Sequence, residues 1–232
     1  MTISATPVVA AFDLDGTLSN GGSVFKWLRY VGGERATLGA SFRLAGPLFV
    51  GALRSGTWAD RAKERLFQRI LAGRDSHEVT DISRSFALAH FEAHGRPFVL
   101  ERLEWHLRQG HDVVIVSASP QIYVEVVAGE FGAAGGLGTR LAVDPQGKLT
   151  GSYLGKNCRG EEKMRRLSEW IDARHYDQAP QVYAYGNSRG DRALLRSANH
   201  PRNVGRLGRL GSLGRFPRLK NGAKGRSVTA GE

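Results

Sequence analysis

The stretch from Phe12 to Leu18, Phe-Asp-Leu-Asp-Gly-Thr-Leu, constrains the fold more than any other part of the sequence. It places two carboxylates, Asp13 and Asp15, directly after the apolar run at residues 8–12, which has the composition of a strand buried on both faces. Burying two unpaired carboxylates costs free energy, whereas a divalent cation offsets their repulsion. Two acids in different surroundings also divide the roles of nucleophile and proton donor. The alternative is that both acids only cap the turn after the strand.

The order of apolar and polar segments predicts alternating strands and helices. Further apolar runs occur at residues 113–116 and 181–185, and they are followed by Ser117 and Gly186. Helical patterns lie between the runs, at residues 98–109, 121–130 and 161–173. Strands that alternate with helices are typical of an α/β protein with a doubly wound parallel sheet. In such sheets ligands bind at the carboxyl ends of the strands, where these polar residues lie.

The chain from residue 20 to residue 95 interrupts this alternation. It contains helix-like pieces and no buried-type strand, so we expect a helical cap inserted after the first strand; the pieces span residues 23–30, 37–53, 58–71 and 77–93. Residues 135–138 are rich in glycine and predict a turn, and residues 144–148 predict a hairpin turn. The predicted division is a core of residues 1–19 and 96–200, a cap of residues 20–95 and a tail of residues 201–232.

The formal charge of +11 is concentrated near the carboxyl terminus. Residues 201–232 hold eight basic residues and one acid, so the first 200 residues are only mildly basic. We expect a flexible basic tail that attracts an anionic membrane surface, an anionic substrate or nucleic acid. Peripheral contact with an anionic membrane is the favoured hypothesis. No specific nucleic-acid partner is expected, because the body of the chain has no recognisable nucleic-acid-binding motif.

The single cysteine, Cys158, excludes an intramolecular disulfide and a cysteine-rich zinc site. No signal-peptide pattern precedes the first apolar run, and no apolar stretch reaches the roughly 20 residues that a membrane-spanning helix needs. We therefore expect a cytoplasmic protein, with the inner membrane face as the place where the tail would act.

These features together resemble the haloacid dehalogenase superfamily, in particular its phosphoserine-phosphatase-like subfamily IB. The first motif of the family, Asp-x-Asp-Gly-Thr, is matched completely by Asp13–Thr17, and Ser117 stands where the second motif has a serine or threonine at a strand end. The fourth motif, usually Gly-Asp-x-x-x-Asp, is present at residues 186–191 with Asn187 in place of the first aspartate. An amide oxygen still suits magnesium, but the site loses one negative charge, so weaker magnesium binding is expected.

The third motif of the family is a lysine that compensates charge on the transferring phosphoryl group. We choose Lys163, because it lies in Glu-Lys-Met-Arg-Arg-Leu at the start of a predicted helix, as in the phosphoserine-phosphatase-like subfamily. Lys156 and Arg159 are open alternatives. A surface lysine without a chemical role is the other interpretation of this position.

The resemblance implies a Rossmann-like core with a type I cap, and Mg²⁺-dependent hydrolysis of a phosphomonoester through an aspartyl-phosphate. Asp13 is the implied nucleophile, and Asp15 the implied acid and then base. The implied ligands of Mg²⁺ are Asp13, the backbone carbonyl of Asp15, Asn187 and Asp191. The implied substrate-binding residues are Thr17, Ser117, Ala118 and Lys163.

Two substrate classes stay open. The subfamily suggests a small amino-acid phosphate, whereas the unusually apolar segment at residues 40–53 and the basic tail favour a lipid-linked phosphate, which we prefer. The alternative for residues 40–53 is packing within the cap itself. Two other protein classes also remain: a catalytically weakened protein that binds a phosphate ligand, suggested by Asn187, and a nucleic-acid-associated protein, suggested by the tail.

Overall fold

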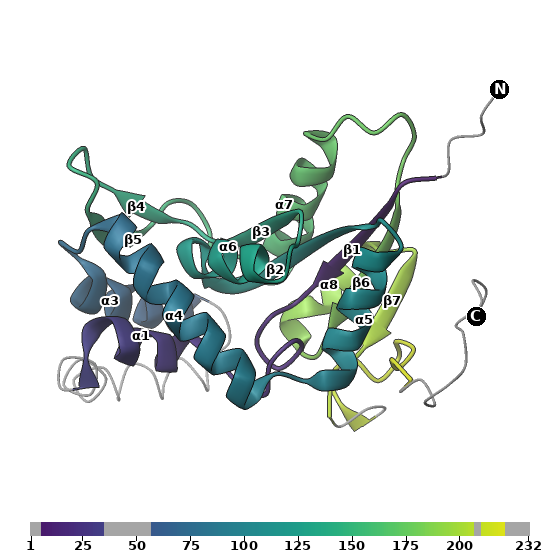
Figure 1. Ribbon diagram of the computed structural model, residues 1–232, viewed down its shortest axis with the longest axis horizontal. Coiled ribbons are helices and arrows are strands. Elements are labelled where there is room, and N and C mark those ends of the chain that lie inside the picture. Colours follow the sequence, from purple (N-terminus) through teal and green to yellow (C-terminus); the bar gives the residue numbers. More distant parts are fainter. Residues whose placement is uncertain (1–5, 35–56, 207–209, 221–232) are drawn as a thin grey trace.

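The centre of the molecule is a parallel five-stranded sheet in the order β3-β2-β1-β6-β7 (Figure 1). The computed structural model describes residues 6–34, 57–206 and 210–220. The strands are β1 Val8–Phe12, β2 Asp112–Pro120, β3 Gly135–Thr139, β6 Gln181–Gly186 and β7 His200–Asn203. Phe12, the last residue of β1, is in register with Ile115 of β2 and Tyr185 of β6. The carboxyl ends of the three central strands therefore meet at one edge of the sheet.

Helices cover both faces of this sheet. They are α5 Pro97–Arg108, α6 Gln121–Glu130, α7 Glu161–Asp172 and α8 Arg192–Ser197. Side chains alternate along β1, so that Ala10 and Phe12 pack in one core with residues of α5 and α6, while Val9 and Ala11 pack in the other with residues of α7 and α8. Because both faces of β1 are buried, its sequence is continuously apolar. The predicted doubly wound α/β fold is confirmed.

The remaining elements, apart from the short 3₁₀ helix η1 at Arg189–Asp191, group at one end of the molecule (Figure 1). They are α1 Val24–Gly32, α3 Thr57–Leu71, α4 Ser76–His94, β4 Leu141–Val143 and β5 Leu149–Tyr153. β4 and β5 form the predicted antiparallel hairpin. The hairpin approaches α3 so closely that a Cβ atom on Gly151 would lie 2.4 Å from Cα of Gln68. The predicted cap helices thus contact a hairpin that belongs to the predicted core segment. The expected helix at residues 37–53 lies outside the described residues.

The glycine-rich segment at residues 135–138 is part of β3, so its prediction as a turn is wrong. A Cβ atom on Gly136 would lie 2.8 Å from the carbonyl oxygen of Val124, and one on Gly138 would lie 2.7 Å from Cα of Gln121. Both contacts are with the backbone of α6, which cannot move away as a side chain can. The glycines serve close packing of a helix on a strand.

The prediction of a flexible tail from residue 201 is wrong for residues 201–206 and 210–220. β7 pairs with β6, the amide of Asn203 donates to the carbonyl of Pro217 at 2.7 Å, and the amide of Leu219 donates to the carbonyl of Asn203 at 3.1 Å. Val204 and Leu213 are buried in the two cores. These two buried apolar residues are spaced irregularly among arginines and glycines, so the sequence shows no strand or helix pattern there. Residues 207–209 and 221–232 lie outside the described residues.

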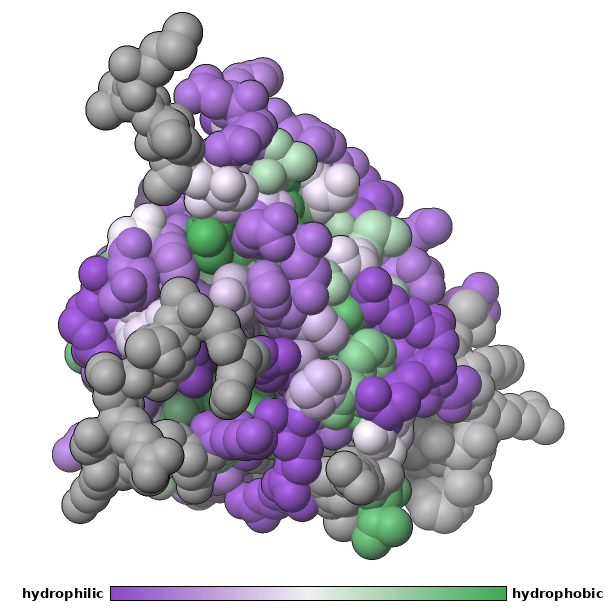
Figure 2. Space-filling model, turned by 90° about the vertical axis from the view of Figure 1, so that its right-hand side faces the viewer, coloured by the Kyte–Doolittle hydropathy of each residue, from purple (hydrophilic) through white to green (hydrophobic). Residues whose placement is uncertain are grey.

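The surface on the side of α5 and β7 is mainly hydrophilic, with small separate apolar patches (Figure 2). Within the described ranges, no helix is both long enough and apolar enough to span a bilayer.

Candidate active site

The loop after β1 holds Asp13 and Asp15 at the carboxyl edge of the sheet. Gly16 in this loop has a φ of +82°, a conformation that residues with a side chain rarely adopt. A Cβ atom on Gly16 would lie 2.0 Å from Nδ2 of Asn187, which comes from the loop after β6. Gly16 is therefore required both for the turn and for the contact between the two loops.

The carboxylate of Asp13 is buried and held on both of its oxygens. Thr17 donates its hydroxyl to Oδ2 at 2.8 Å, and Nζ of Lys163 donates to Oδ1 at 2.5 Å. Burial and the nearby charge of Asp191 raise the pKa of Asp13, while Lys163 and Thr17 oppose this rise. The group predicted as nucleophile thus has a fixed orientation and a perturbed pKa, as groups at functional sites often do.

Lys163 bridges two buried carboxylates. Its Nζ lies 2.5 Å from Asp13 and 2.7 Å from Oδ1 of Asp191, and only 2% of the residue is exposed. Burial acts to lower the pKa of Lys163, but the two carboxylates outweigh it and raise the pKa above its usual value. Of the three cations considered for this role, Lys163 is the one that contacts Asp13. Lys156 is exposed and does not line the cavity, whereas Arg159 lines it.

Asp191 is fixed by the loop after β6. Its Oδ2 accepts the amide of Asn187 at 3.2 Å, the amide of Ser188 at 3.0 Å and the hydroxyl of Ser188 at 2.9 Å. Gly186 permits this arrangement, because a Cβ atom there would lie 2.5 Å from Cβ of Asp191. The side chain of Asn187 lines an adjacent cavity, which also contains Gly16.

Asp15 is held by two donors from separate parts of the chain. The amide of Ser23 donates to Oδ1 at 2.6 Å, and the hydroxyl of Ser119 donates to Oδ2 at 2.8 Å. Ser119 was not predicted from the sequence. Its position two residues after Ser117, on the same side of the extended strand, is a signal that was available.

The predicted substrate-binding residues separate into two groups. Ser117 and Ala118 line the cavity with Lys163, whereas Thr17 is fully buried beneath Asp13 and does not line it. The hydroxyl oxygen of Ser117 accepts the amide of Ser119 at 3.1 Å, so its own proton is free to be donated.

The cavity beside Asp13 has a volume of about 250 Å³, and the cap contributes part of its wall. Lys63 on α3 donates to the carbonyl of Ala118 at 2.6 Å, and Asp60 accepts a hydrogen bond from Asn157 at 2.6 Å. None of these three residues was predicted from the sequence. For Lys63 a signal existed: it lies three and four residues before the buried Leu66 and Phe67, which places a lysine on the apolar face of an amphipathic helix.

The four groups predicted to hold a divalent cation all offer oxygen. They are the carboxylates of Asp13 and Asp191, the carbonyl of Asp15 and the amide of Asn187. Oδ1 of Asn187 is buried and accepts no hydrogen bond from the described residues. Among those residues, no three acidic, histidine or cysteine side chains are grouped as a metal site. Hard oxygen donors together with an unpartnered buried carbonyl oxygen nevertheless fit Mg²⁺.

Comparison with known proteins places the chain in a family. It matches the model of haloacid dehalogenase-like hydrolases over residues 10–196. It is 31% identical over 196 residues to protein CicA of Caulobacter vibrioides, which covers 83% of this chain and 84% of that protein. It is 26% identical over 195 residues to a histidinol-phosphatase of Neisseria meningitidis, which covers 83% of this chain and 88% of that protein.

Solved structures agree with this fold. A protein of unknown function from Bordetella pertussis Tohama I has a TM-score of 0.73 at 23% identity, covering 86% of this chain and 90% of that chain. A phosphoserine phosphatase with a phospho-aspartyl intermediate analogue has a TM-score of 0.57 at 18% identity, covering 86% and 87%. The chain belongs to the haloacid dehalogenase-like hydrolase family, and the predicted enzyme class, a phosphatase of this family, is confirmed.

Proposed function

We propose that this protein hydrolyses a small, polar phosphomonoester in an Mg²⁺-dependent reaction, with Asp13 as the nucleophile. The observation that carries the proposal is the buried carboxylate of Asp13, held by Thr17 and Lys163 at the wall of a polar cavity. Two hydrogen bonds fix the carboxylate before a substrate arrives, so little reorganisation is needed for attack on phosphorus.

The proposed reaction has two steps, formation of an aspartyl-phosphate on Asp13 and its hydrolysis. Asp13 attacks phosphorus, the bond from phosphorus to the alcohol oxygen breaks, and Asp15 donates its proton to the departing alkoxide. Asp15 then takes a proton from water, the resulting hydroxide attacks phosphorus, and the bond to Asp13 breaks to release inorganic phosphate. Ser23 and Ser119 hold Asp15 for both proton transfers.

The phosphoryl group needs positive charge and donors around its oxygens. Lys163 supplies a cation, and Ser117 supplies a hydroxyl proton at the edge of β2. Mg²⁺, held by Asp13, the carbonyl of Asp15, Asp191 and Asn187, would screen the repulsion between the phosphate and the attacking carboxylate.

The composition of the cavity favours a polar alcohol as the leaving group. Besides the residues around Asp13, its wall is formed by Asp60, Lys63, Asn157 and Arg159, and its volume of about 250 Å³ suits a small molecule. The lipid hypothesis rests on the apolar residues 40–53, which lie outside the described residues, and on the basic tail; the described lining residues of the cavity are mainly polar and charged and include no large apolar side chain for a lipid chain to contact. The relative that is a histidinol-phosphatase acts, by its name, on a small polar ester.

The test is phosphate release by the purified protein with Mg²⁺ or with EDTA. The substrates are phosphoserine, histidinol phosphate and a lysophosphatidic acid, and we expect turnover of a small ester only, and only with Mg²⁺. Asp13→Asn should lower turnover by about 10³-fold or more, because an amide is not a nucleophile. Asp81→Asn, which removes an exposed carboxylate on α4, is the matched control and should retain full activity.

The effect of beryllium fluoride on the Tm distinguishes a phosphatase from a protein that only binds phosphate ligands. It mimics a phosphoryl group on a carboxylate, so with Mg²⁺ it should raise the Tm of the wild type and leave that of Asp13→Asn unchanged. Equal phosphate release by Asp13→Asn and the wild type would exclude Asp13 as the nucleophile.

A further inference from the structure

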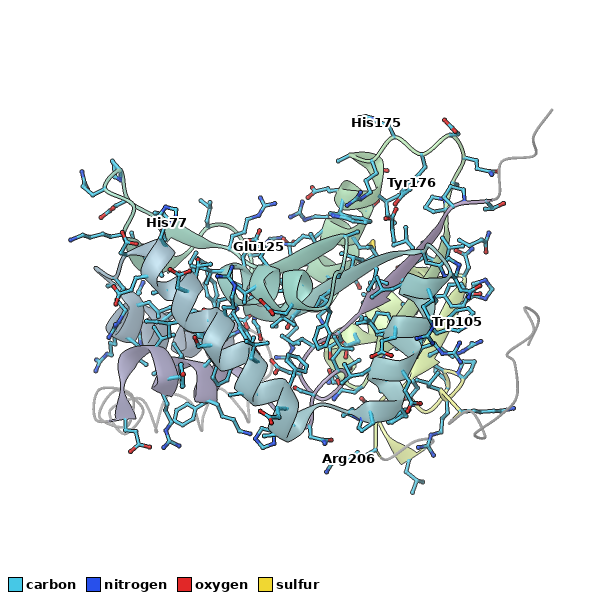
Figure 3. The ribbon with its side chains drawn as sticks, in the orientation of Figure 1. His77, Trp105, Glu125, His175, Tyr176 and Arg206 are labelled. Carbon is cyan, nitrogen blue, oxygen red and sulfur yellow. The ribbon has the colours of Figure 1, made fainter. Side chains whose placement is uncertain are left out.

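A second polar cavity, of about 620 Å³, lies between the start of α5 and the carboxyl-terminal segments. We call it the basic groove, and define it by its four cationic residues, Arg96, Arg206, Arg218 and Lys220. Among the residues that the structure describes, no acid lines it, and it shares no lining residue with the catalytic cavity. Figure 3 shows Arg206 at the lower edge of the molecule, below the connection between α4 and α5.

No carboxylate of the described part of the chain pairs with a cation of the basic groove. Arg218 and Lys220 are exposed, and their side chains form no hydrogen bond or ion pair with other residues that the structure describes. Arg206 donates to Oδ1 of Asn20 at 2.9 Å, which is a neutral partner. Three positive charges therefore face one concave surface, and no carboxylate in residues 6–34, 57–206 or 210–220 pairs with them.

Arg96 is the buried member of the groove and is held rigidly. Only 8% of the residue is exposed, and its guanidinium donates to the carbonyls of Gly16 and, at 2.8 Å, Val204. The guanidinium also lies 4.9 Å from the centre of the Phe98 ring. Burial, and then the charge of Arg206, lower the pKa of Arg96. A guanidinium has five N–H groups, so donors remain for a ligand in the groove.

We propose that the basic groove is a binding site for a small anion that carries several phosphoryl groups. The described lining of the groove has four cations and no acid, so an anion with three or four negative charges neutralises it more completely than a single phosphate does. Arginine is the side chain best suited to paired hydrogen bonds with phosphate oxygens, and three of the four cations are arginines. The volume lies within the range of small-molecule sites, and the concave shape favours a compact ligand over a flat membrane or a duplex. This site is separate from the proposed hydrolysis at Asp13.

The test is calorimetric titration of the full chain with sodium tripolyphosphate in EDTA at low salt. We expect one site, and binding of inorganic phosphate at least about tenfold weaker, because it neutralises fewer of the cations. Arg218→Gln/Lys220→Gln should weaken tripolyphosphate binding by at least about tenfold and leave the fold unchanged, since both side chains are exposed. The matched control is Arg108→Gln/Lys148→Gln, which removes the same charge from exposed positions outside all three described cavities and should leave the affinity unchanged.

Equal affinity of the two double variants would overturn the proposal, since it would place the anion elsewhere on the molecule. Equally tight binding of inorganic phosphate would overturn the requirement for several phosphoryl groups. Binding of a single-stranded oligonucleotide or of anionic vesicles without binding of tripolyphosphate would assign the groove to a macromolecular surface. None of these measurements involves turnover, so their failure leaves the proposed hydrolysis untouched.

Discussion

The catalytic cavity and the basic groove are both polar, but their charges are balanced in different ways. In the catalytic cavity the buried Lys163 lies between the carboxylates of Asp13 and Asp191. In the basic groove, Arg218 and Lys220 are exposed, and the lining residues that the structure describes include no acid. A charge that is withdrawn from water must be compensated within the fold, whereas an exposed charge is compensated by water and salt. In the catalytic cavity the buried cation is paired with carboxylates, whereas in the basic groove the buried Arg96 is held by backbone carbonyls and the cations without a described partner are exposed.

Removing the central cation of the catalytic cavity is the strongest test of this comparison. Lys163→Met leaves two carboxylates buried side by side, so the free energy of unfolding should fall by about 3–5 kcal/mol, measured in urea. Lys163→Met/Asp13→Asn/Asp191→Asn should recover most of the loss, because no buried charge remains. Lys156→Met, at an exposed lysine, should change stability by less than about 0.5 kcal/mol. Equal losses for Lys163→Met and Lys156→Met would contradict the balance described for this cavity.

The pH dependence of KM should show whether Lys63 of the catalytic cavity binds the substrate, because a lysine with a lowered pKa loses its charge near pH 8 and an arginine does not. Burial lowers the pKa of Lys63 to about 8, although Asp15 and Asp60 act to raise it. Lys63 is therefore charged below pH 8 and loses its charge above it. If Lys63 binds an anionic group of the substrate, KM should rise about tenfold between pH 7 and pH 9. Lys63→Arg keeps its charge over this range, so its KM should not change with pH. Arg65→Lys, on the exposed face of α3, is the control and should show the same rise in KM as the wild type. An identical profile in the wild type and Lys63→Arg would exclude this role.

Adding a carboxylate beside the catalytic cavity should tighten magnesium binding. Asn187→Asp restores the acid that the family motif usually has, so the half-saturating Mg²⁺ concentration should fall by about threefold. The Tm should drop without Mg²⁺, because a new charge lies near Asp191, and should recover when Mg²⁺ is added. Asn20→Asp adds the same charge to the neighbouring cavity and is the control. A higher Mg²⁺ requirement in Asn187→Asp would mean that the site depends on a neutral ligand.

The smallest effect is expected in the basic groove. Arg218→Gln/Lys220→Gln removes repulsion between exposed cations, so the Tm should rise by about 1 °C at low salt and be unchanged at high salt. Melting curves at both salt concentrations measure this. A fall in Tm at low salt would show that a carboxylate pairs with these cations.

The elements that the sequence predicted well are those decided by neighbours along the chain. β1 and the loop Asp13–Thr17 combine an apolar run, two acids and a glycine within ten residues, and the structure has them as expected. α7 begins after Gly160, with Glu161 and Glu162 in its first turn, which its dipole favours. The placement of Lys163 near the start of that helix followed from the same local pattern.

The elements that the sequence did not predict depend on distance in space. Gly136 and Gly138 gave the pattern of a turn, because nothing local shows that the backbone of α6 lies against them. The docking of residues 210–220 depends likewise on contacts with β7, which is itself a short strand with a proline and polar residues.

The sequence by itself determined the family, the parallel sheet and the chemical groups around Asp13, because each of these is indicated by a short run of neighbouring residues. Only the tertiary structure decided which distant residues complete the site: Lys63 comes from the cap, Ser119 from the far end of β2, and Arg96 joins the catalytic loop to the carboxyl-terminal segment. The physical reason is that hydrogen bonds and ion pairs act over about 3 Å in space, whatever the separation along the chain.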